Sequence, residues 1–121
     1  MAQDFTVNQG ATKRFSVVYS YDDNGEKVPY DLTNCSARMQ LRSAPGGDLY
    51  LTLATPPDGS GITITPAEGK LDVLMTATQT TAITVRRAVY DLELKFPDQT
   101  VVRLIEGTFT FSPEVTTDSD E

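Results

Sequence analysis

Two acidic residues in the C-terminal third of the chain have a spacing that could support hydrolytic chemistry. Asp91 and Glu93 are separated by one residue, and alternate residues of a strand lie roughly 6.6 Å apart on one face. Glycoside hydrolysis uses two carboxylates that are about 5 to 10 Å apart. The apolar residues Tyr90, Leu92 and Leu94 alternate with this pair, however, and predict that both carboxylates face solvent. We therefore interpret Asp91 and Glu93 as part of a solvated strand face.

A second acidic cluster lies around a turn signal. Asp22, Asp23 and Glu26 flank Asn24-Gly25, a dipeptide that tolerates positive φ angles and strongly favours a β-hairpin turn. A calcium loop needs oxygen ligands at regular alternating positions that end in a more distant glutamate, and this cluster is too short for that. The hairpin explains the cluster, and we expect neither a metal site nor a cofactor in this chain.

The composition removes most other kinds of catalytic site. The chain contains no histidine, the commonest general base and metal ligand, so Ser-His-Asp and Cys-His arrangements are impossible. Its single cysteine, Cys35, excludes an internal disulfide and a cysteine-rich zinc site. The place of Cys35 beside an apolar strand favours the role of a small buried hydrophobic residue. A glycine-rich phosphate loop is missing as well, and we expect a protein that is not an enzyme.

Length and charge indicate one globular domain that does not bind nucleic acid. The 121 residues include 39% hydrophobic and 22% charged residues, which is typical of a folded domain of modest size. The formal net charge of −7 opposes binding by neutralisation of phosphates. The chain lacks a run of about 18 apolar residues, so its sequence does not predict a membrane-spanning helix. The N-terminus has no secretory signal pattern. We therefore expect no membrane partner. We place a single domain at residues 1–113 and an acidic tail at residues 114–121.

Strict alternation of apolar and polar side chains, the pattern of half-buried strands, recurs along the chain. In residues 36–42, apolar side chains point one way, and Arg38 and Arg42 point the other. Similar strand signals occupy residues 4–7, 13–21, 48–53, 62–65, 71–76, 88–96, 101–106 and 107–111. About eight or nine short strands, spaced by roughly 8 to 12 residues, predict an all-β sandwich.

Three local features qualify the strand pattern. In residues 13–21 the alternation predicts that Tyr19 and Tyr21 face inward. The threonine-rich segment 77–85 is the least strand-like, and it predicts a short turn of helix or a crossing loop. Gly107 predicts a bulge within one long final strand.

A set of short motifs occurs in a fixed order along nearly the whole chain. In order, these motifs are Gln9-Gly10, Asn24-Gly25, Pro29–Thr33, Ala37–Ser43, Tyr90–Glu93, Arg103–Gly107 and Ser112–Thr116. By this ordered set the chain resembles a family of small structural proteins of tailed bacteriophages and prophages. The polar bend at Pro29–Thr33 is also similar to the leading segment of the N-terminal domains of some phage baseplate proteins. Asn34-Cys35 departs from the family pattern, in which a glycine is commoner at this point.

The residue types of the polar bend indicate a structural role rather than a chemical one. Pro29 fixes its own φ angle, and Asp31 or Thr33 can hydrogen-bond nearby backbone N–H groups. We expect Leu32 to lie under the sandwich while the bend moves the chain from one sheet to the other. The motif therefore identifies a fold rather than a chemistry.

The resemblance implies an immunoglobulin-like antiparallel β-sandwich that serves as a virion structural protein. It implies an assembly or adaptor module of the tail, neck or baseplate, made in the bacterial host cytoplasm and incorporated into the virion. Its partners would be other virion proteins, which it would contact in multiple symmetric copies. A head decoration protein that stabilises the capsid is the first alternative. A carbohydrate-binding β-sandwich that aids adsorption is the second, although the chain has no tryptophan for an aromatic platform.

Candidate partner-binding residues lie at edges and ends of the expected fold. An edge strand offers free N–H and C=O groups that a partner strand can pair with, and the first strand is the best candidate. Four arginines could form a basic patch if their strands are adjacent, and the acidic tail could dock on a basic partner. The candidate residues are therefore Asp4, Phe5, Thr6, Val7, Arg38, Arg42, Arg86, Arg87, Glu114 and Asp118.

Overall fold

The computed structural model of the protein describes residues 2–113, which fold mostly into β-strands. Within these residues there are ten strands, one short α-helix and one 3₁₀ turn. In chain order they are β1 (Phe5–Asn8), β2 (Lys13–Val18), β3 (Ser20–Asp23), β4 (Glu26–Pro29), β5 (Ser36–Arg42), β6 (Leu49–Ala54), β7 (Ile62–Thr65), η1 (Pro66–Glu68), β8 (Lys70–Met75), α1 (Ala77–Ala82), β9 (Arg87–Lys95) and β10 (Val101–Ser112). The expectation of an all-β fold is confirmed.

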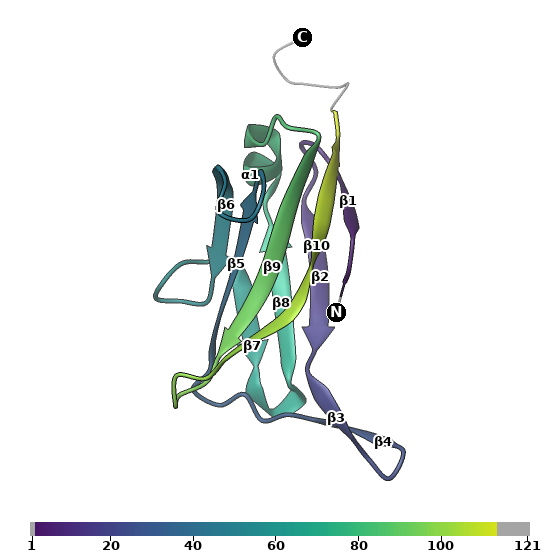
Figure 1. Ribbon diagram of the computed structural model, residues 1–121, viewed down its shortest axis with the longest axis vertical. Helices are drawn as coiled ribbons and strands as arrows, with labels where there is room; N and C mark the ends of the chain where they lie inside the picture. Colours follow the sequence, from purple (N-terminus) through teal and green to yellow (C-terminus); the bar gives the residue numbers. More distant parts are fainter. Residues whose placement is uncertain (1, 114–121) are drawn as a thin grey trace.

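The strands form two facing sheets and a small projecting hairpin (Figure 1). One sheet has the strand order β1-β10-β9-β5-β6, and the other has the order β2-β8-β7. The β3-β4 hairpin extends beyond one end of these two sheets (Figure 1). All strand pairs are antiparallel except β1 with β10, which is parallel. The fold is therefore sandwich-like, and the expectation of a wholly antiparallel sandwich is wrong at β1.

The core consists of the side chains that the two sheets turn toward each other. In β5 and β9 every second residue is buried, as their alternating sequences predict. Phe109 on β10 is completely buried at the centre of an aromatic cluster. Its ring centroid lies 5.1 Å from that of Phe5 on β1, 4.7 Å from Tyr90 on β9 and 6.4 Å from Phe15 on β2. Because β2 belongs to the opposite sheet, this cluster ties the two sheets together.

The bulge in β10 comes earlier than the sequence suggests. The register between β10 and β9 shifts between Arg103 and Ile105, which makes Leu104 the extra residue. The bulge lets the consecutive side chains of Leu104 and Ile105 both reach the core. Gly107 stays opposite Tyr90 in the β10-β9 ladder, so it does not form the bulge. A side chain at Gly107 would overlap the carbonyl oxygen of Gln3, where the N-terminal segment passes β10.

The N-terminal segment is held against β9 and β10 by hydrogen bonds to side chains. The Tyr90 hydroxyl donates to the carbonyl oxygen of Gln3 at 2.6 Å. The backbone N–H and the hydroxyl of Thr108 both donate to one carboxylate oxygen of Asp4, at 3.0 and 3.1 Å. Burial, with a smaller effect from the charge of Asp4, raises the pKa of the Tyr90 hydroxyl far above its usual range. The folded state therefore favours neutral Tyr90.

The β3-β4 hairpin, called the arm below, departs most from the sequence expectation. β8 begins at Lys70, opposite Val18, so β2 has no partner strand beyond this point. The chain leaves the sheet there and pairs β3 with β4 around Asn24-Gly25, whose φ angles of 53° and 87° fit the predicted turn. Tyr19 is half-buried, but Tyr21 is 44% exposed. The prediction that Tyr21 faces inward is therefore wrong.

The polar bend carries the chain from the arm to β5, and so from the three-stranded sheet to the five-stranded one, as expected. The backbone N–H and the hydroxyl of Thr33 donate to an Asp31 carboxylate oxygen at 3.0 and 2.6 Å, and these bonds lower the pKa of Asp31. Leu32 is buried, and its N–H donates to the carbonyl oxygen of Pro66 at 3.1 Å.

Cys35 is half-buried rather than fully buried, and burial raises the pKa of its thiol.

The threonine-rich segment forms the short helix α1, one of the two structures expected there. The Thr76 hydroxyl accepts from the Gln79 N–H at 3.2 Å, and the Gln79 side chain accepts from the Thr76 N–H at 2.8 Å. This capping box starts the helix. The buried Thr80 hydroxyl donates to the carbonyl oxygen of Ala11 at 2.9 Å, which attaches α1 to the β1-β2 connection. Within residues 2–113, no helix is long and apolar enough to span a membrane.

We predict that Tyr90→Phe lowers the free energy of unfolding by about 1 kcal/mol at neutral pH, because the hydrogen bond to Gln3 is lost. The folded state raises the pKa of Tyr90 above its unfolded value of about 10. The stabilising contribution of Tyr90 is therefore complete below a pH of about 10 and is lost as the pH rises further. Urea denaturation from neutral to alkaline pH should show the difference between the two proteins shrinking.

The matched control for this experiment is Tyr50→Phe. Tyr50 is partly buried against the core, and its hydroxyl has no hydrogen bond to another described residue. Its replacement should change the free energy of unfolding by less than about 0.5 kcal/mol at any of these pH values. A constant difference between the wild-type and Tyr90→Phe proteins across the whole pH range would contradict the account.

Candidate functional site

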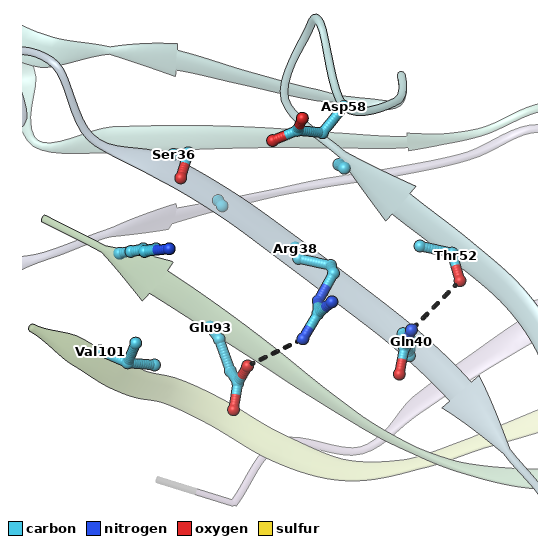
Figure 2. A pocket seen from close by; sticks show the side chains of 10 residues that line it. Ser36, Arg38, Gln40, Thr52, Asp58, Glu93 and Val101 are labelled. Atoms are coloured by element: carbon cyan, nitrogen blue, oxygen red, sulfur yellow. Dashed lines mark hydrogen bonds and ion pairs between the residues drawn. The ribbon is translucent and has the colours of Figure 1, made fainter. Parts of the chain in front are cut away.

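The outward face of the five-stranded sheet carries a shallow groove over β6, β5 and β9 (Figure 2). Its volume is about 450 Å³, and polar or charged side chains line most of it. Arg38 on β5 and Glu93 on β9 point toward one another, with 3.8 Å between Nη2 and Oε1 (Figure 2). Beside them, the Gln40 side-chain amide donates to the Thr52 hydroxyl at 3.4 Å (Figure 2). Arg38 and Glu93 therefore offset each other's charge. Asp58 and Lys95, which also line the groove, form no ion pair with a described residue.

A second groove, of about 430 Å³, lies farther along the same face. Here the guanidinium of Arg103 on β10 lies 3.6 Å from Asp91 and 3.0 Å from Glu106. The hydrogen bond from Arg103 to Glu106 and the charge of Glu106, with a smaller effect from Asp91, raise the pKa of Arg103. Asp91 and Glu106 are opposite each other in the register of β9 and β10. Arg103 thus offsets the repulsion of two like charges on neighbouring strands.

The two carboxylates considered for glycoside hydrolysis do not share a groove, because Glu93 lines the first and Asp91 lines the second. Asp91 and Glu93 face outward, as their strand pattern predicts, and each lies beside an arginine. The acidic cluster of residues 22–26 belongs to the arm. Among residues 2–113, no three His, Cys, Asp or Glu side chains lie close enough together to hold a metal ion.

The structure does not bring the four candidate arginines together. Arg38 lies in the first groove beside an acid. The Arg42 guanidinium donates to the Gln40 side chain at 3.0 and 3.3 Å and to the carbonyl oxygen of Gly47 at 2.9 Å, and so stabilises its own hairpin. Arg86-Arg87 lie where β9 begins, at the end of the sandwich opposite the arm (Figure 1). A single basic patch is therefore not formed.

β1 is an edge strand, as expected, and β10 is its neighbour in the sheet. Most of the candidate side chains at β1 nevertheless make contacts within the fold. Phe5 stacks on Phe15 with 4.4 Å between ring centroids, Val7 is buried, and Asp4 accepts hydrogen bonds from β10. Asp4 and Thr6 are the exposed members of this group, and Thr6 has no such contact within the described fold. A partner at this edge would therefore contact Thr6 and the backbone rather than all four candidate residues.

A cluster of aromatic side chains at the base of the arm is not foreseen by the strand pattern. Tyr19 and Tyr30 stack with ring centroids 4.3 Å apart and an interplanar angle of 19°, and Tyr21 lies tilted against Tyr30 at 4.9 Å. Tyr21 and Tyr30 are 44% and 36% exposed, and Val18, just before the arm, is 57% exposed. We call Tyr19, Tyr21 and Tyr30 the arm patch.

One feature of the sequence could have revealed the arm patch. Four of the six residues 22–27 are charged, and the other two are the Asn24-Gly25 turn. A hairpin of this composition has no apolar face to bury, so it cannot continue the core of a sandwich. The tyrosines that flank it therefore lie at the boundary between the core and an exposed arm.

Comparison of the sequence with models of known protein families and with curated proteins gave no match. The two tail residues among the candidates, Glu114 and Asp118, lie outside the described residues. Within residues 2–113, the two grooves described above each contain an arginine–carboxylate ion pair, and the arm carries exposed aromatic side chains.

We predict that Arg103→Leu lowers the urea midpoint of unfolding at low salt, because Asp91 and Glu106 then face one another without a cation between them. Added salt should reduce the loss, since it screens the repulsion between exposed carboxylates. The comparison variant is Arg38→Leu, which removes one longer ion pair and should have the smaller effect. Urea denaturation at low and high salt measures both. Equal, salt-independent losses in the two variants would refute this explanation of Arg103.

Proposed function

We propose that this protein is a non-enzymatic structural component of a tailed-bacteriophage virion, an assembly or adaptor module of the tail, neck or baseplate. The observation that carries the proposal is the arm, which projects from the two sheets and leaves Tyr21 and Tyr30 exposed at its base (Figure 1). Tyrosine is enriched at protein–protein interfaces, where its ring adds contact area and its hydroxyl stays hydrogen-bonded. The ordered motifs from Gln9-Gly10 to Ser112–Thr116 support the phage assignment.

The proposed module is immunoglobulin-like, and the strand order supports this assignment. The order β2-β8-β7 corresponds to strands B, E and D of such a sandwich, while β5-β9-β10 corresponds to strands C, F and G. β6, beside β5, then takes the position of the additional strand C′ of variable-type domains. In this assignment the arm lies in the connection between strands B and C, at one end of the sandwich. Connections at the ends of such sandwiches are where binding surfaces are built.

The base of the arm is supported well enough to present a defined surface. An isolated two-stranded hairpin is marginally stable in water. Here the Tyr19 N–H donates to the carbonyl oxygen of Gly69 at 2.8 Å, and the Tyr30 N–H donates to that of Tyr19 at 2.9 Å. The stacked rings of Tyr19 and Tyr30 reinforce this attachment. A partner would therefore meet a preorganised arm, which lowers the entropic cost of the contact.

A carbohydrate-binding role is the alternative that the arm patch raises. A sugar platform needs an aromatic ring with a free face. Tyr19 and Tyr30 cover one face of each other, and the tilted Tyr21 ring lies against Tyr30, so the three rings pack on one another rather than forming a flat platform. This geometry favours a protein partner, which can use ring edges and hydroxyl groups, over a sugar. Head decoration, the other alternative, would use the same kind of surface and differs in copy number.

We predict that quantitative mass spectrometry of purified particles finds roughly 6 to 40 copies of this chain per virion, because tail and neck rings have low cyclic symmetry. The major capsid protein of the same particles is the internal standard. A head decoration protein follows the icosahedral lattice and would be present on the order of hundreds of copies.

The possible counts lead to different conclusions. A count in the hundreds would replace the tail, neck or baseplate placement with head decoration. Absence of the chain from particles would overturn the virion proposal as a whole. Binding to a glycan array by a chain that is present in particles would support the carbohydrate-binding alternative.

A further inference from the structure

Basic side chains gather at the end of the sandwich that lies opposite the arm. β2 begins with Lys13 and Arg14, and β9 begins just after Arg86 at Arg87 (Figure 1). We call these four residues the basic end. None of them forms an ion pair with another residue in the range 2–113. The neighbouring residues 76–85, which include α1, contain no charged side chain. The basic end therefore carries positive charge that pairs with no described carboxylate, and the Lys13 Nζ lies 5.5 Å from the centroid of the Phe5 ring.

The arm has the opposite character. Asp22, Asp23 and Glu26 surround its turn, with Lys27 as the only cation in residues 20–29. All three carboxylates are exposed, and none forms an ion pair with a described residue. The exposed rings of Tyr21 and Tyr30 lie at the base of the same hairpin. An acidic tip above an aromatic base matches a partner surface that is rich in arginine, because guanidinium groups pair with carboxylates and stack on aromatic rings.

We infer that the arm of one copy docks on the basic end of a second copy, so that copies assemble head to tail. The inference rests on the proposed assembly role and names one partner for it, another molecule of the same chain. Asp22 and Asp23 would pair with Arg86 and Arg87 of the next copy, and Tyr21 would lie against the neutral surface beside them. The two surfaces are at opposite ends of each molecule (Figure 1), so the contact can repeat along a row of copies.

The sign of the charges disfavours two-fold dimers through two arms or through two basic ends. A two-fold dimer through the arms would place two acidic tips together, and one through the basic ends would place arginines together. Both arrangements juxtapose like charges, which costs several kcal/mol across an interface. A head-to-tail contact is heterologous, so it closes into a ring when the rotation between copies permits and extends as a filament when it does not. A ring is the outcome that suits a tail or neck component.

A charge-swap experiment on the full-length chain tests this contact. The arm-reversed variant carries Asp22→Lys and Asp23→Lys, and the end-reversed variant carries Arg86→Glu and Arg87→Glu. Sedimentation velocity at low salt and rising protein concentration measures self-association. The wild-type protein should associate, and salt should weaken the association because the contact is ionic. Each variant alone should associate at least about tenfold more weakly, since like charges then meet.

The mixture of the two variants is the decisive sample. The basic arm of one variant meets the acidic end of the other, so mixing should restore association. The net-charge control is Asp58→Lys with Asp98→Lys, two exposed residues outside the arm and the basic end that form no ion pair with a described residue, which changes the net charge by the same amount as the arm-reversed variant. This control should associate like the wild type. Circular dichroism of each variant confirms that it is folded.

Four outcomes would overturn the inference. A wild-type protein that stays monomeric at all concentrations would overturn it. So would an end-reversed variant that associates normally, since that points to a contact through the arms alone, and so would a mixture that stays dispersed. Association that appears only after deletion of residues 114–121 would show that this acidic segment, rather than the arm, occupies the basic end. Because these measurements use purified protein, their failure is distinguishable from absence of the chain in particles.

Discussion

The ring of Phe109 makes the contact on which the rest of this structure depends. It is completely buried and meets the rings of Phe5, Phe15 and Tyr90, which come from both neighbouring strands and from the opposite sheet. Each aromatic pair adds about 0.5–1.5 kcal/mol beyond the burial of its area, and truncation of a buried phenylalanine typically costs about 3–5 kcal/mol. The parallel pairing of β1 with β10 is only four residues long, and Phe5 in this cluster adds to the hydrogen bonds of Gln3 and Asp4 that hold β1 in the sheet.

The same contact determines where the surface features lie. Phe15 fixes β2 against the core, and β8, the partner of β2, begins at Lys70. The chain must therefore leave the sheet after Val18, and it forms the arm there. At the other end of the two sheets, the starts of β2 and β9 bring the basic residues to the surface, including Arg86-Arg87. A contact surface on either end is thus built on strands that the core holds rigidly, which suits repeated assembly.

Local chemistry predicts much of this fold, because strand alternation and turn signals depend on neighbouring residues. The buried faces of β5 and β9 and the turn at Asn24-Gly25 are of this kind. The bulge at Leu104 and the exposure of Tyr21 depend instead on where a partner strand lies and ends, which alternation does not encode. The positions of the candidate arginines also depend on strand pairing. Arg38 lies opposite Glu93 in the register of β5 with β9, and this separates it from Arg86-Arg87 at the start of β9.

We propose that this chain is an assembly module of the phage tail, neck or baseplate and that it contacts its neighbours through its arm. Cryo-electron microscopy of particles that contain the chain tests this claim most directly. The account predicts copies arranged around the tail axis, each with its arm against a neighbouring protein. Copies distributed over the icosahedral lattice of the head, or arms that extend into solvent without a neighbour, would contradict it.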